Sequence, residues 1–183
     1  MEKLSKLLRS FLLLFTNEQI ADSKEQNNII NSLFHWVKKR NDPIQNTNRI
    51  KIGDVYFFYF GLNLLPTMSY RHMGIVISKS SKYLYVLPIT GYKSDNNIFK
   101  LNIEHVLMKV QNFEFLTKDS VVKLKDVRCI AVNAIDFKTD LVGKIDVNGE
   151  FFKLIKRKCF ESIFNEYAYE LDKLKEQRDL LKK

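Results

Sequence analysis

The 183-residue chain has few of the residues that build disulfide frameworks, metal sites or fibres. Its two cysteines, Cys129 and Cys159, stand alone, without a CxxC or Cys/His spacing. This excludes a disulfide scaffold and gives no zinc motif. Six glycines and three prolines are too few for a fibrous or disordered chain. The low cysteine content is typical of a reducing compartment, and we therefore expect a cytoplasmic protein.

Long apolar runs and nucleotide-binding motifs are also missing. The uninterrupted apolar stretch near the start covers only residues 11–15, whereas a membrane span needs about 20 residues. The polar segment that follows has no small-residue cleavage site. Leu4, Leu7, Leu8, Phe11, Leu12 and Phe15 recur at helical spacing, so this segment is predicted to be an amphipathic helix that packs on protein. Attachment to a membrane surface through this helix is the less favoured alternative.

No GxxxxGK[ST], GxGxxG or GxSxG pattern occurs, which disfavours nucleotide hydrolysis and serine-hydrolase chemistry. The chain does carry a formal charge of +9, from 30 Lys and Arg against 21 Asp and Glu. A basic balance favours association with polyanions such as RNA, DNA or anionic membranes. Because solubility alone can also account for such a charge, the charge does not decide the partner.

The hydrophobic pattern divides the chain into a helical extension, residues 1–48, and a main domain, residues 49–183. A second helix is expected around 29–37, with Ile29, Leu33, Phe34, Trp36 and Val37 on one side; it ends before Asp42-Pro43. Short strands are expected at 51–62, 73–78, 82–90, 98–103, 120–124 and 127–132. A helix capped by Asn148 should follow. Short strands with tight turns predict an α+β protein built on a small antiparallel barrel.

One stretch, "SYRHMGIVISKSSKYLYVLPIT", places possible catalytic groups at the ends of two expected strands. Arg71 and His72 open the first strand, and Thr90 closes the second. Metal-free RNA cleavage needs a base for the 2′-OH, a cation for the phosphorane and an acid for the leaving oxygen. Arg, His and Thr can fill such roles. His35 and His105 have no Cys or His at ligand spacing and are interpreted as structural.

The order of several motifs resembles the MazF/PemK family of toxin endoribonucleases. "GDVY" at 53–56, "PIT" at 88–90 and "DSVVKLKDVRCI" at 119–130 are similar to three of its conserved segments. The similarity extends over about residues 51–165. It implies an SH3-like antiparallel barrel with a C-terminal helix, usually a homodimer. It also implies sequence-specific cleavage of single-stranded RNA without metal or cofactor, and a cognate antitoxin protein.

The resemblance also suggests which residues form the site. Thr90 occupies the position of the family's catalytic Thr or Ser. His72 stands where the family has Arg, and Arg71 lies one residue earlier. Since neighbouring residues of a regular strand face opposite sides of a sheet, only one of these two can share a pocket with Thr90.

RNA contacts are expected from Tyr70, by stacking on a base, and from Lys93 and Arg128, through phosphates. An ion pair of Arg128 with Asp126 or Asp119 is the alternative for that arginine. If neither His72 nor Arg71 completes the site, the chain is a catalytically inactive barrel that binds RNA or protein.

Overall fold

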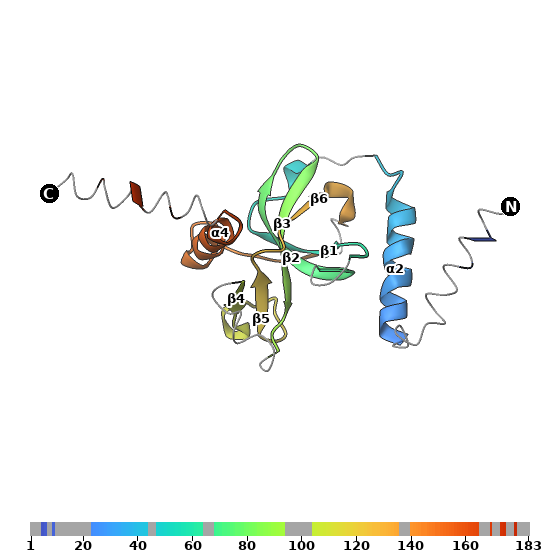
Figure 1. Cartoon of the computed structure of the whole chain (residues 1–183), viewed down its shortest axis with the longest axis horizontal. Helices are drawn as coiled ribbons and strands as arrows, with labels where there is room; N and C mark the ends of the chain where they lie inside the picture. The colour runs from blue at the N-terminus through green and yellow to red at the C-terminus, as the bar shows by residue number, and fades with distance from the viewer. Residues whose placement is uncertain are drawn as a thin grey trace.

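A computed structural model describes residues 23–43, 47–63, 68–93, 104–135 and 140–164, together with residues 5, 6, 9, 169, 173, 174 and 178. The expected strand at 98–103 and most of the expected first helix lie outside these residues. Within them, the chain forms an α+β structure with one sheet between two helices, α2 (Ser23–Lys39) and α4 (Glu150–Ile163). The two helices lie on opposite sides of the sheet (Figure 1).

Seven strands form the sheet, and every pairing between them is antiparallel. They are β1 (Asp54–Tyr59), β2 (Arg71–Lys79), β3 (Tyr83–Gly91), β4 (His105–Met108), β5 (Ser120–Lys123), β6 (Arg128–Ala131) and β7 (Leu141–Lys144). The order is β4-β5-β3-β2-β1-β7, and β6 pairs with the first half of β3. Among the described residues, β4 and β7 do not pair, so the sheet is not closed into a barrel.

The structure confirms five of the expected strands and adds two that the sequence did not reveal. β4 and β7 have four residues each, and neither segment was predicted to be a strand. The expected cap of the last helix is wrong: α4 begins after Gly149, which makes no side-chain capping bond. Asn148 instead donates its backbone N–H to Asp146 Oδ1 at 2.9 Å, in the turn before the helix.

Apolar side chains fill both faces of the sheet because successive residues of each strand point to opposite sides. One cluster packs the sheet against α4 through Phe152, Ile155 and Cys159. The other cluster, on the opposite face, includes Phe58 and Val86. Burying these side chains supplies the main driving force for folding, and the second cluster ends at the polar groups described below.

Side chains of α2 contact β1 and the residue that precedes β2. The ring of His35 stacks on Tyr59, with centroids 3.7 Å apart and an interplanar angle of 12°. Near the start of α2, Glu25 Oε1 accepts a hydrogen bond of 2.8 Å from the Tyr70 hydroxyl. The apolar side chains expected to lie together on one side of this helix divide: Ile29 is buried, whereas Phe34, Trp36 and Val37 are exposed. Of the helices described, none has the length and apolar character needed to cross a membrane.

Candidate active site

The pairing of β2 with β3 decides whether Arg71 or His72 faces Thr90. Met73 pairs with Ile89, and the register is regular at this end of β2. Met73 and Ile89 are the last pair of this ladder, and His72 and Thr90 are the next residue on each strand. Because side chains alternate along both strands, these two residues leave the ladder on the same face of the sheet. His72 and Thr90 therefore share one face of the sheet, and both are half-buried.

Arg71 lies on the other face, away from Thr90. Its guanidinium carbon sits 4.0 Å from the centroid of the Phe57 ring and 6.0 Å from that of Tyr59. Its Nη2 donates a hydrogen bond of 2.9 Å to Asp140 Oδ1. This guanidinium is thus held by a carboxylate and two aromatic rings, and the structure does not bring it together with Thr90.

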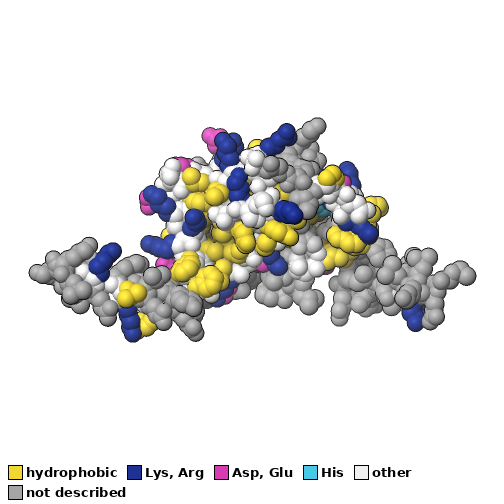
Figure 2. Space-filling view, turned by 90° about the horizontal axis from the view of Figure 1, so that it is seen from above, with side chains coloured by type: hydrophobic (Ala, Val, Ile, Leu, Met, Phe, Trp, Pro, Cys, Tyr) yellow, Lys and Arg dark blue, Asp and Glu magenta, His cyan; other side chains and the backbone are white. Residues whose placement is uncertain are grey.

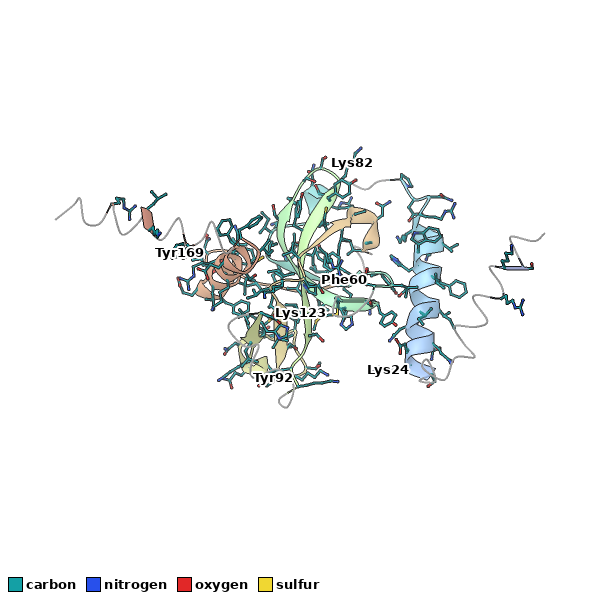
Figure 3. The ribbon with its side chains drawn as sticks, in the orientation of Figure 1. Lys24, Phe60, Lys82, Tyr92, Lys123 and Tyr169 are labelled. Carbon is teal, nitrogen blue, oxygen red and sulfur yellow. The ribbon has the colours of Figure 1, made fainter. Side chains whose placement is uncertain are left out.

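Lys123 is a cation on the His72 face that the sequence did not single out. Thr90 pairs with Val121 of β5, and Lys123 follows two residues later, so its side chain leaves β5 on the same face. In Figure 3, Lys82 and Tyr92 mark the two ends of β3, and Lys123 lies between them. Burial lowers the pKa of His72 below its usual 6.5, and the positive charge of Lys123 lowers it further. His72 is therefore mostly neutral near pH 7.

Asp126 connects Lys123 with Arg128. Its Oδ1 lies 2.7 Å from Arg128 Nε, and its Oδ2 lies 3.6 Å from Lys123 Nζ. The backbone N–H of Met68 donates a 2.6 Å hydrogen bond to the same carboxylate, which is buried. Arg128 pairs with Val86 across β3; Val86 and Thr90 are four residues apart, so Arg128 shares the His72 face. We refer to Lys123, Asp126 and Arg128 as the cation cluster.

The other residues expected to bind RNA are placed differently. Tyr70 has a positive φ of 65° and uses its hydroxyl to bond Glu25. Burial, that hydrogen bond and the charge of Glu25 raise the pKa of Tyr70 to about 12. Lys93 is an exposed side chain three residues beyond Thr90. Tyr70 is thus engaged with α2, whereas Lys93 is open to solvent.

The other histidines and the cysteines do not form a second site. His105 is buried on β4 opposite Lys123, and His35 is stacked on Tyr59. Cys159 is a buried residue of α4, and burial raises the pKa of its thiol. Within the described ranges, no three His, Cys, Asp or Glu side chains are grouped so that they could hold a metal ion.

A cavity of about 720 Å³ lies elsewhere, between the end of β4 and the start of α4. Its lining includes Lys109, Phe113, Lys144 and Phe151. His72, Thr90 and the residues of the cation cluster are not part of that lining. It is therefore separate from the candidate site.

No known family model matches this chain, and no curated protein matches it. The geometry of the site is accordingly the basis for assigning a function.

Proposed function

We propose that this protein is a metal-independent endoribonuclease of the MazF/PemK type that cleaves single-stranded RNA. The observation that supports the proposal is the strand register, because His72 and Thr90 follow the Met73–Ile89 pair on their strands and share one sheet face. A neutral imidazole and a hydroxyl side by side match the needs of 2′-OH transesterification. The nearby positive charge of Lys123 matches the negative charge that develops on the phosphate.

In the proposed reaction, neutral His72 accepts the proton of the ribose 2′-OH. The 2′-oxygen attacks the adjacent phosphorus, forming a new P–O bond as the bond to the 5′-oxygen breaks. The Thr90 hydroxyl donates a hydrogen bond to a phosphate oxygen. The leaving 5′-oxygen takes a proton from water and protonated His72 returns its proton to the solvent, so the products are a 2′,3′-cyclic phosphate and a 5′-hydroxyl. The lowered pKa of His72 suits the base role, because the imidazole is unprotonated near pH 7.

The proposal extends to the setting in which such an enzyme acts. It includes an SH3-like, barrel-type fold for the curved sheet, a homodimer, a cytoplasmic location and a cognate antitoxin protein that inhibits cleavage. The formal charge of +9 supports a polyanionic substrate. In Figure 2, Lys and Arg side chains are spread over the visible face among apolar side chains, not gathered in one patch. We therefore assign specificity to the site itself.

The test is incubation of the purified chain with a long unstructured RNA in EDTA, followed by mapping of the cut ends. Wild type should give site-specific cuts with 2′,3′-cyclic phosphate ends. Thr90→Val, which removes the hydroxyl at nearly constant volume, and His72→Ala should each lower the rate by at least about 100-fold. Thr90→Ser and Arg71→Ala are the matched controls and should retain cleavage. Equal cleavage by wild type and Thr90→Val would overturn the proposal.

A non-cleaving binding module is the second candidate. It is favoured by the exposed side chains of α2, since Phe34 is 72% exposed and Trp36 is 59% exposed. Exposed aromatic side chains of this kind are enriched where proteins bind one another. RNA binding without cleavage at any enzyme concentration would support this candidate over the endoribonuclease.

A further inference from the structure

The site described above has a base and a hydroxyl but lacks the arginine that the sequence offered as its cation. Arg71 lies on the opposite face and is paired with Asp140. The cations on the His72 face are those of the cation cluster. Lys123 is close enough to His72 for its charge to lower the imidazole pKa. A phosphate bound at His72 and Thr90 would therefore meet Lys123 first.

Arg128 has donor capacity that the described part of the chain leaves unused. Its Nη2 is buried and donates to no atom in the part of the chain that the structure describes. Its Nε lies 2.7 Å from Asp126 Oδ1, but the Nε–H is not directed at that oxygen for a hydrogen bond. A buried guanidinium nitrogen without an acceptor is unfavourable, so such groups in native proteins commonly mark a place for a ligand or ion. The geometry of a guanidinium fits an oxyanion.

Asp126 does not neutralise the cluster. A single carboxylate is shared by two cations and also accepts the N–H of Met68. The cluster therefore carries a net charge of about +1 before any ligand binds. The shared carboxylate fixes both cationic side chains on the same sheet face, where an anion can contact them together.

We propose that Lys123 and Arg128 form an oxyanion site that binds the scissile phosphodiester of RNA, and that Asp126 positions both cations. This inference rests on the proposed function and names the cation that stabilises the phosphate. Lys123 contacts the phosphate at the His72–Thr90 position, and Arg128 uses Nη2 on the same or the adjoining phosphate. A free phosphate ion shares this chemistry and serves as a probe of the site.

The binding test uses the full chain, inorganic phosphate, and a single-stranded DNA oligonucleotide, which lacks the 2′-OH and cannot be cleaved by this route. Lys123→Met keeps the aliphatic stem and removes the charge. Lys125→Met is the matched control, because Lys125 is exposed, two residues away, and paired with Glu104 at 3.2 Å. Lys123→Met should weaken oligonucleotide binding by about tenfold and lower the salt slope by about 0.7. Lys125→Met should bind within about twofold of wild type. Equal losses in both variants would overturn the inference.

The positioning role of Asp126 has its own readout in the NMR titration of His72. Lys123→Met should raise the pKa of His72, and Asp126→Asn should lower it, because the carboxylate partly offsets the lysine charge. His105 also lies on this face, opposite Lys123, and its signals are assigned with His105→Gln. No change in the His72 titration in either variant would refute the cluster, and this measurement needs neither RNA nor activity.

Failure of the inference and failure of the proposed function give different results. If RNA is cut in a His72- and Thr90-dependent way but Lys123→Met cleaves at the wild-type rate, the oxyanion site is wrong and the function stands. If no RNA is cut but Lys123→Met and Arg128→Met lose phosphate binding, measured by phosphate-induced shifts of the His72 ring signals, the site stands without the reaction. Thermal unfolding of each variant shows whether it is folded. If Arg128→Met does not fold, the comparison of Lys123→Met with Lys125→Met decides the outcome.

Discussion

Arg71 and His72, adjacent in β2, lie on opposite faces of the sheet. His72 is across from Thr90, whereas Arg71 donates to Asp140 Oδ1 at 2.9 Å and lies over the Phe57 ring. Arg71 and His72, which were alternatives for one role in the sequence, therefore have separate environments. In the proposed enzyme, the imidazole belongs to the site and the guanidinium belongs to the structure around α2.

Arg71→Ala is expected to lower stability while leaving cleavage within about threefold of wild type. The side chain is 41% exposed and its partner Asp140 only 5% exposed, so loss of the ion pair should cost about 1 kcal/mol after allowance for solvent screening. Urea unfolding measures the stability change, and the RNA assay measures the rate. A loss of cleavage as large as that in His72→Ala would assign Arg71 to the site instead.

Cleavage should fall on acidification with an apparent pKa below 6.5. Burial and the charge of Lys123 lower the pKa of His72, so the unprotonated base persists to a lower pH than an ordinary histidine. The same shift makes protonation favour the unfolded chain. The contribution of His72 to the free energy of unfolding is thus constant above pH 6.5. It declines as the pH falls from 6.5 toward the lower pKa of the folded state.

The measurement is the pH profile of kcat/KM, with the NMR titration of His72 beside it. The charged groups that share its face are Lys123, Asp126, Arg128 and His105. Lys123→Met should move the acidic limb to higher pH. A midpoint above 6.5 in wild type would contradict the assignment of His72 as the base.

The hydrogen bond between Tyr70 and Glu25 should couple α2 to the start of β2. Tyr70→Phe removes the donor of a bond to a carboxylate and is expected to cost about 1 kcal/mol. Glu25→Gln should cost a similar amount, and the double variant little more than either single variant. A double-mutant cycle by urea unfolding measures this coupling. Strictly additive losses would show that the two side chains act independently.

Gly74→Ala should destabilise the fold by about 1–3 kcal/mol through overpacking. An added Cβ would collide with Cγ1 of Val86 and approach the Phe58 ring at 3.0 Å. Val86→Ala in the same chain should therefore relieve part of this cost, although alone it leaves a cavity. Gly61→Ala is the contrasting variant: it has open space but a φ of +81°, so about 1 kcal/mol of backbone strain is expected. If Val86→Ala gives no relief, contact with Val86 is not the reason that position 74 requires glycine.

Sequence patterns predicted the longer strands because alternation over many residues leaves little ambiguity. β2 and β3 have nine residues each, and both were expected. The four-residue β4 and β7 were not expected, since their pairing with β5 and β1, not their own composition, makes them strands. The cap at Asn148 was wrong because Asp146 forms the turn before α4 and takes the N–H of Asn148.

For the candidate site, the sequence singled out His72, Thr90 and Arg128 but not Lys123. It named Asp126 only as a possible ion-pair partner of Arg128, and the structure contains that ion pair. His72 and Thr90 end recognisable strands, so their chemical types stand out locally. The importance of Lys123 comes from β5 pairing with the end of β3, and that of Asp126 from a hydrogen bond with Met68, 58 residues away. Neither relationship has a local signature.

The sequence by itself determined the strand-rich character of residues 51–132, the helix that follows it, the basic charge, and the types of side chain available for chemistry. These follow from local periodicity and composition, which each segment carries on its own. Only the tertiary structure decided that His72 faces Thr90, that Arg71 is turned toward Asp140, and that Lys123 and Arg128 share one carboxylate. Strand register sets these relationships, and a shift of a single residue would exchange the two faces of β2.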